Sequence, residues 1–279
     1  MISLILITSF YDCERISINK INSLSKNELA KVMMNPIIVT DAMSHWDIPK
    51  TYDTFSQKFG HHLILARRTR FARIVDSSSF GSFSYRSENK YNIKTSESPH
   101  IPVTEYMKHF TEEYIVLFDH EPGMSEHEQI LINDLKNYRI TPSFLSKRNI
   151  TMFFSFGSNR HGANTANHGF TWIALVSGTK LWHVADGQVM KPAEPNCNID
   201  PPQRIPNTLA CIQRENEIMT LPTAWWHSTC NLDNFTIGVG GQDSCDLGCQ
   251  RDAIEKNLPF CQNKDRHYKC WGADEKQEL

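Results

Sequence analysis

The chain has 279 residues, of which 40% are hydrophobic and 22% are charged, and this ordinary globular composition is ample for one sizeable core. The formal net charge of −2 gives no basic excess of the kind that a nucleic-acid-binding surface shows. The sequence contains no run of about 18 apolar residues, so no transmembrane segment is expected. We therefore expect a globular protein with no nucleic-acid partner.

The N-terminal part opens on an apolar segment. Residues 1–10, MISLILITSF, have the length of the apolar region of a signal peptide, although no Lys or Arg precedes them. They are expected to be a signal peptide, and the alternative is a first buried strand. Residues 16–34 carry apolar side chains at helical spacing, with a capping box at Ser25 and Glu28. The β-branched run 36–40 then predicts a short strand.

Short predicted elements alternate over the next hundred residues. A turn and a short helix are expected over 41–46, and a helix over 54–59 should end at Gly60. The other expected elements are strands at 63–66, 71–75 and 114–118, helices at 103–110 and 126–138, and a long loop or hairpin at 77–98.

From residue 151 the pattern becomes β throughout. Short apolar runs recur at regular spacing and are broken by Gly, Pro and Asn, which favours a sandwich or barrel. The predicted fold class is an all-β core with flanking helices, an α+β arrangement, within one domain at residues 11–241. The predicted strands are 151–156, 170–176, 180–184, 209–214, 217–221, 227–231 and 236–240.

A cysteine-rich extension is expected over residues 242–272. It holds Cys245, Cys249, Cys261 and Cys270, four of the eight cysteines of the chain. An even number of clustered cysteines predicts disulfides in an oxidising compartment. A tetrahedral zinc site is the alternative, but zinc sites more often contain C-x2-C pairs, so two disulfides within the extension are favoured.

The polar tail at residues 273–279 ends in KQEL, which is similar to the KDEL signal for retrieval to the endoplasmic reticulum. Together with the apolar N-terminus and the cysteines, it predicts residence in the lumen of the endoplasmic reticulum. Two N-x-T sequons, at Asn149 and Asn234, are compatible with a glycoprotein.

Three segments together resemble the JmjC/cupin-like family of the Fe(II)/2-oxoglutarate oxygenase superfamily. PIIVTDAMSHW at 36–46 resembles the motif P-V-V-I-x-G-x-x-x-x-W. SFG at 155–157, followed by HGFTWIALVSGTKLW at 168–182, resembles the region with the first metal ligands and the G-x-K-x-W strand. The segment at 217–233 carries P-x-x-W-W-H-x-x-x-N-L. The resemblance covers residues 30–241, is closest to lumenal JmjC-like proteins, and implies a double-stranded β-helix, also called a jelly roll.

The resemblance also implies a set of site residues. His227 matches the distal histidine of the facial triad that holds Fe(II) with two His and one carboxylate. Lys180 matches the lysine that, in the asparaginyl-hydroxylase branch of the family, pairs with the distal carboxylate of 2-oxoglutarate, and a buried lysine needs such a counterion. The alternative is a lysine that faces the surface beside a packed Trp182. Trp182 and Asn231 stand at the motif positions beside Lys180 and His227 and are assigned with Lys180 to cofactor binding.

The first two ligands, H-x-D/E in the family, are not matched in this sequence. In the ungapped register the motif falls on Thr165 and Asn167, and with a one-residue deletion it falls on Ala166 and His168. No Asp or Glu occurs between Thr151 and Lys180. The predicted metal ligands are therefore His168 and His227, without the usual carboxylate.

Three functions are compatible with these motifs and with the incomplete set of metal ligands. The first is a JmjC-like lumenal protein with a degenerate iron site, which binds a protein client or a small-molecule ligand and has weak or no oxygenase activity. The second is a Fe(II)/2-oxoglutarate-dependent protein hydroxylase with a non-standard metal site. The third is a cupin without oxygenase chemistry that binds a sugar or another metabolite.

Overall fold

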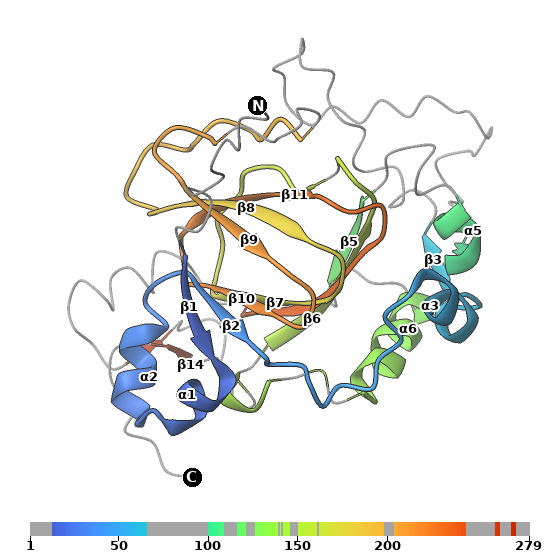
Figure 1. Cartoon of the computed structure of the whole chain (residues 1–279), viewed down its shortest axis with the longest axis horizontal. Helices are drawn as coiled ribbons and strands as arrows, with labels where there is room; N and C mark the ends of the chain where they lie inside the picture. The colour runs from blue at the N-terminus through green and yellow to red at the C-terminus, as the bar shows by residue number, and fades with distance from the viewer. Residues whose placement is uncertain are drawn as a thin grey trace, which may run out of the picture.

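In the computed structural model of this chain, the described residues are mostly β-sheet with a few short helices (Figure 1). The expected signal peptide, the expected strand at 71–75 and the expected loop at 77–98 lie outside the described residues. The described residues are 13–65, 100–108, 116–120, 126–138, 140, 142–145, 150–160, 162–197, 204–243, 260–262 and 269–271.

The helix expected to open at the Ser25 capping box and to end near residue 34 is confirmed, but the segment before it is only partly helical. The N-terminal segment forms a strand and two short helices, because Ser17 and Ser25 each cap a separate helix start. Ser25 and Glu28 make the predicted capping box. Ile16 lies in a strand and pairs in parallel with Val39, so its partner is remote in sequence. The elements are β1 (Glu14–Ser17), α1 (Ile18–Ser23), α2 (Lys26–Val32) and β2 (Ile37–Thr40).

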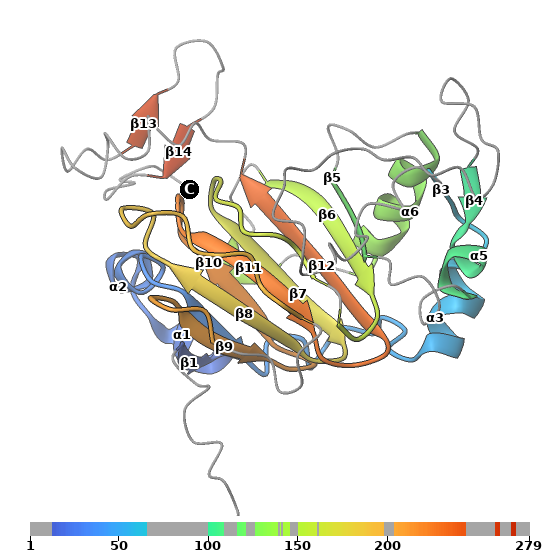
Figure 2. The same ribbon diagram turned by 90° about the horizontal axis from the view of Figure 1, so that it is seen from above.

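The middle of the chain contributes mainly helices at one side of the molecule (Figure 2). The predicted helices over 54–59, 103–110 and 126–138 are confirmed with shifted ends, whereas residues 41–46 form turns without a helix. The elements are α3 (Tyr52–Phe59), β3 (Leu63–Leu65), β4 (His100–Pro102), α5 (Val103–Lys108), β5 (Val116–His120), α6 (Glu126–Lys136) and the 3-10 turn η2 (Ser143–Leu145).

The core is built from two sheets that lie face to face (Figure 1). The larger has the strand order β1-β2-β10-β7-β12-β6-β5, and the smaller has the order β11-β8-β9. After β7 the chain crosses to the small sheet for β8 and β9, returns for β10, crosses for β11 and returns for β12. All seven strands predicted after residue 151 are confirmed as β6 (Ile150–Gly157), β7 (Thr171–Ser177), β8 (Lys180–Ala185), β9 (Leu209–Gln213), β10 (Ile218–Leu221), β11 (Trp226–Asn231) and β12 (Thr236–Asp243).

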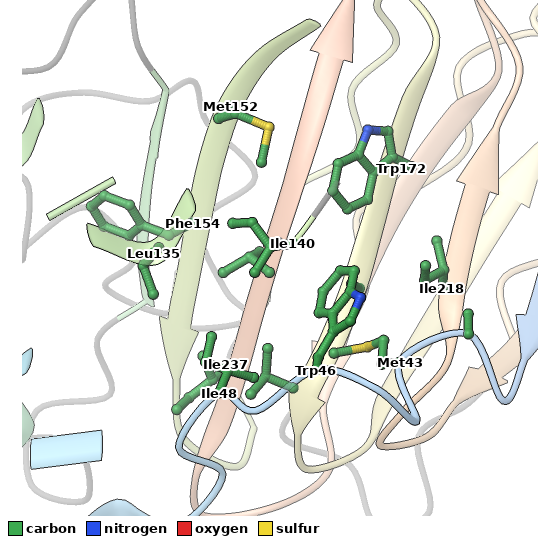
Figure 3. Packing of buried hydrophobic residues seen from close by; sticks show 14 of the residues in the cluster. Met43, Trp46, Ile48, Leu135, Ile140, Met152, Phe154, Trp172, Ile218 and Ile237 are labelled. Atoms are coloured by element: carbon green, nitrogen blue, oxygen red, sulfur yellow. The ribbon is translucent and has the colours of Figure 1, made fainter. Parts of the chain in front are cut away.

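The main hydrophobic core lies on the outer face of the large sheet, away from the small sheet. Trp172 and Phe154 point from the sheet toward Trp46 and Leu135, which come from the N-terminal segment and α6 (Figure 3). All four side chains are buried. This apolar layer fixes the large sheet independently of what lies between the two sheets.

In the space between the sheets, large side chains pack directly on β12. Phe153 and Ile173 lie over two glycines of β12, because a Cβ atom at Gly240 would come within 2.4 Å of the Phe153 ring and one at Gly238 within 2.6 Å of Ile173. Together with Trp182 of the small sheet, Phe153 and Ile173 belong to a second, smaller cluster. Polar side chains of the small sheet, among them Lys180 and His227, face the same space.

Two disulfides hold the domain together. Cys13, just before β1, is bonded to Cys211 of β9, with 5.4 Å between the Cα atoms. Cys197, in the loop after β8, is bonded to Cys230 of β11, with 5.3 Å between the Cα atoms. The expectation that the chain carries disulfides is therefore confirmed, and both bonds lie in the β domain.

The predicted bonds within the C-terminal extension fall mostly outside the described residues. The exception is a hairpin formed by β13 (Phe260–Gln262) and β14 (Lys269–Trp271), in which Cys261 and Cys270 are directly opposite one another. β12 runs two residues past the domain boundary expected at 241. In the described part of the chain, no helix is long and apolar enough to span a bilayer.

Candidate functional site

The structure brings the two predicted metal ligands, His168 and His227, into direct contact. His227 lies at the start of β11, and His168 lies in the segment that precedes β7. Their Nε2 atoms are 3.0 Å apart, and the rings meet edge to face with centroids 4.5 Å apart. His227 is buried and His168 is half-buried, so the pair sits at the margin of the space between the sheets.

The hydrogen bonds of the two rings determine their tautomers. Nδ1 of His227 lies 2.9 Å from the carbonyl of Trp225, and Nδ1 of His168 lies 3.0 Å from the carbonyl of Gly169. A carbonyl only accepts, so Nδ1 of each ring carries a proton, and the two Nε2 atoms face each other. Burial, and then the neighbouring His168, lower the pKa of His227 to about 3, which keeps that ring neutral.

Two facing ring nitrogens suit a shared cation. Because Nδ1 is protonated on both rings, a hydrogen bond between the two Nε2 atoms would require a second proton on one ring. Two nitrogen ligands about 2.1 Å from one ion, at right angles, would be about 3 Å apart, which matches the observed separation. The carbonyls that accept from both Nδ1 atoms orient the rings as outer-shell partners do at metal sites. The pair therefore has the donor chemistry of a two-histidine metal site.

The backbone pairing distinguishes the two motif registers that the sequence left open. Ala166 and His227 exchange both backbone hydrogen bonds, at 2.9 and 2.8 Å, so their side chains lie on the same face. The Thr165 side chain is directed elsewhere, since its hydroxyl donates to the carbonyl of Ala193. The geometry favours the gapped register, with Ala166 and His168 beside His227.

Among the described residues, this face offers no third protein ligand. Ala166 has no donor atom, and its side chain is exposed. Within the described ranges, no group of three or more His, Cys, Asp or Glu residues is arranged to hold a metal ion. The donor set therefore falls one ligand short of the two-histidine, one-carboxylate triad.

The other predicted site residues line the same face of the small sheet. Lys180 of β8 pairs in register with Asn231 of β11, and both are buried. Burial lowers the pKa of Lys180 to about 8. Within the part of the chain that the structure describes, both polar atoms of the Asn231 amide lack a hydrogen-bond partner. A buried ammonium group beside an unsatisfied amide is a suitable environment for an anionic ligand.

Trp182 has a role that the sequence did not indicate. Its indole N–H donates to Gln213 at 2.9 Å, and Gln213 in turn donates to the carbonyls of Ile173 and Glu217. The only polar atom of Trp182 is thus engaged within the protein. Its ring lies 6.3 Å from that of His227, so Trp182 forms a wall of the site. Gln213 belongs to none of the motifs, and its hydrogen bonds link the small sheet to the large sheet.

Along β11, the inner face presents His227, then Thr229, then Asn231. Thr229 fixes the segment before His168, because its hydroxyl accepts the N–H of Ala163 and its own N–H donates to the carbonyl of Ala163. His227 and Asn231 are four residues apart on one strand, which corresponds to about 13 Å. The histidine pair and the Lys180–Asn231 pair are therefore two ends of one polar face.

Comparisons with known proteins give limited information. No family model matches the sequence, and no curated protein matches it. Among solved structures, the X-ray structure of E. coli ycfD is similar at a TM-score of 0.45 and 14% sequence identity. The match covers 92% of this chain and 64% of the length of ycfD.

Proposed function

We propose that the chain is a JmjC-like protein with a double-stranded β-helix fold. The order of strands in the two facing sheets supports this proposal, because the chain crosses between the sheets four times from β7 to β12, as a jelly roll requires. The P-x-x-W-W-H segment supports it independently, since it places His227 at the start of β11 on the inner face.

The function that the site supports best is binding of an anionic ligand or client, with weak or no oxygenase activity. The observation that carries this proposal is the buried pair of Lys180 and the unsatisfied amide of Asn231. A carboxylate such as that of 2-oxoglutarate would neutralise the ammonium group and satisfy the amide. The absence of a ligand at Ala166 favours binding over turnover, because Fe(II) would be held by two neutral imidazoles alone.

A Fe(II)/2-oxoglutarate-dependent protein hydroxylase is the second candidate. The specific observation in its favour is the pair of facing Nε2 atoms, whose orientation the carbonyls of Trp225 and Gly169 fix. A bound Fe(II) would supply oxygen activation there. His168 and His227 would hold the metal, Lys180 would hold the distal carboxylate of the cosubstrate, and Trp182 would shield the site from water.

We place this function in the lumen of the endoplasmic reticulum. The disulfides Cys13–Cys211 and Cys197–Cys230 support an oxidising compartment. Localisation of the full-length chain by microscopy, compared with a chain that lacks residues 276–279, tests the assignment. Secretion of the shortened chain is the expected result, and a cytosolic location of both chains would contradict it.

The binding proposal is tested by calorimetric titration of the disulfide-bonded protein with 2-oxoglutarate. Lys180→Met should abolish binding, whereas Lys191→Met is the matched control, since Lys191 is an exposed lysine paired with Glu194. Succinate formation in the presence of Fe(II) separates the two candidates, because only the hydroxylase should turn 2-oxoglutarate over. Unchanged binding in Lys180→Met would remove the proposed anion site.

The motif register is tested by restoring a family-like pair of ligands. Ala166→His combined with His168→Asp should raise Fe(II) affinity, because both side chains would lie on the face of His227. Thr165→His combined with Asn167→Asp is the control and should not raise it, since the Thr165 side chain is directed toward Ala193. The reverse result would establish the ungapped register.

A further inference from the structure

Asn234 lies on the turn between β11 and β12 and is the acceptor residue of an N-x-T sequon. The sequon consists of Asn234, Phe235 and Thr236. Asn234 is exposed, whereas Phe235 is half-buried and Thr236, the first residue of β12, is 1% exposed. The side chain that would carry a glycan is therefore accessible in the folded chain, while the residue that completes the motif is not.

Contacts with two other parts of the chain hold this turn in place. The N–H of Leu232 donates to the carbonyl of Thr179 at 2.9 Å, which ties the turn to the connection between β7 and β8. On the other side, the ring centroid of Phe235 lies 5.5 Å from that of Tyr52 and 6.3 Å from that of Phe55, both in α3. The sequon therefore cannot extend away from the folded domain without loss of these contacts.

The hydroxyl of Thr236 is enclosed by the same turn. It donates to the carbonyl of Asp233 at 3.5 Å, and a Cβ atom at Gly178 would come within 2.8 Å of it. Gly178 has a φ of 86° and no side chain, which allows the β7–β8 turn to approach this closely. N-glycosylation requires Ser or Thr at this position of the sequon, so the transferase reads the hydroxyl. It can reach the Thr236 hydroxyl only before the turn has closed.

We propose that Asn234 carries an N-linked glycan, which is added before the turn between β11 and β12 closes. The proposal rests on the proposed lumenal location, because the donor, an oligosaccharide linked through pyrophosphate to a lipid, is used there. The amide nitrogen of Asn234 bonds to C1 of the first sugar and releases one proton to solvent, while the bond from C1 to the pyrophosphate oxygen breaks and the lipid pyrophosphate leaves. Asn234 follows the end of β11 that is remote from His227, so the glycan is attached away from the histidine pair.

Attachment is tested with the full-length chain expressed in eukaryotic cells, in an Asn149→Gln background that leaves Asn234 as its single sequon. Digestion with peptide-N-glycosidase in heavy-oxygen water should increase the gel mobility and convert residue 234 to a labelled Asp, which mass spectrometry detects. Asn234→Gln should abolish both signals. Gln188→Asn combined with Met190→Thr adds a sequon at an exposed turn and reports whether the chain has entered the lumen.

The added sequon separates failure of this proposal from failure of the location on which it rests. A glycan at the added sequon with none at Asn234 would overturn the proposal and leave the lumenal location in place. An absence of glycan at both positions would overturn the lumenal location, and the proposal with it.

The order of events is tested with the disulfide-bonded protein produced without glycan in bacteria. Solubilised transferase and lipid-linked oligosaccharide should modify a blocked peptide of residues 231–238 more than about tenfold faster than the folded protein, because the folded turn must first open. Tyr52→Ala removes a ring contact of Phe235 without changing the sequon, so it should narrow this difference. Equal rates for the peptide and the folded wild type would show that the closed turn does not block transfer, and would overturn the proposed order.

Discussion

The two faces of the large sheet have different compositions. The outer face packs large apolar side chains, among them Phe154 and Trp172, against the N-terminal segment and α6. The inner face carries a smaller apolar cluster, and across from it the small sheet presents Lys180, Asn231 and His227. The stability of the folded chain therefore rests mainly on packing at the outer face. The inner face is therefore expected to tolerate substitution of its polar side chains without loss of the fold.

Truncation of the outer face should have the largest effect. Phe154→Ala removes a fully buried ring and is expected to lower the free energy of unfolding by about 4 kcal/mol. Ser155→Ala is the matched control, because Ser155 is the next residue of β6 and points to the inner face; its cost should stay below about 1 kcal/mol. Denaturant unfolding measures both. Similar costs for the two variants would mean that the faces do not divide stability in this way.

The inner face should instead become more stable when its buried charge is removed. The pKa of Lys180 is about 8 in the folded state and 10.5 ordinarily, so the unfolded chain binds more protons between these values. Stability therefore rises with pH across that window, by about 2 kcal/mol between pH 7.5 and 9.5. Lys180→Met should remove this rise and raise stability at pH 7.5.

Denaturant unfolding of both proteins at the two pH values measures this difference. Lys191→Met serves as the control, since Lys191 is exposed and should leave the rise unchanged. An identical pH dependence in wild type and Lys180→Met would show that Lys180 is not the group that titrates. Saturating 2-oxoglutarate should reduce the rise in the wild type, because a bound carboxylate stabilises the charged lysine.

The smallest expected effect comes from the turn that leads to His227. Ala224 has a φ of 68°, in the left-handed region that costs a residue with a Cβ atom about 1 kcal/mol. Ala224→Gly should therefore raise stability by about 0.5 kcal/mol, after the greater freedom of glycine in the unfolded chain is subtracted. Ala193→Gly, in an exposed loop position without positive φ, should lower it. Thermal unfolding measures both, and a loss in Ala224→Gly would contradict the strain.

The strands could be predicted from the sequence because their signals are local. Residues 151–240 alternate short apolar runs with Gly, Pro and Asn, and each run became a strand. β1 was missed because Ile16 lies within apolar helical spacing, while the interactions that make it a strand come from Val39 and from the Cys13–Cys211 bond. Contacts between residues so far apart leave no mark in a local pattern.

Only those residues of the candidate site that lie in recognisable motifs could be predicted from the sequence. His168 and His227 were identified from a resemblance, and the structure brings them within 3.0 Å of each other. The position of Ala166 beside His227 depends on backbone pairing between two segments. This pairing could not be predicted from a single sequence. Gln213 carries no motif at all, and only its hydrogen bonds to both sheets reveal it.

The disulfide between Cys13 and Cys211 constrains how the chain matures during synthesis. The two residues are 198 positions apart, so about 10 to 40 s separate their emergence from a ribosome that adds about 5–20 residues per second. No cysteine lies between Cys13 and Cys197, so the first thiol that Cys13 meets in its own chain belongs to the native partner of Cys230. The native pairing therefore requires that Cys13 either stays unpaired until β9 is made or exchanges partners afterwards.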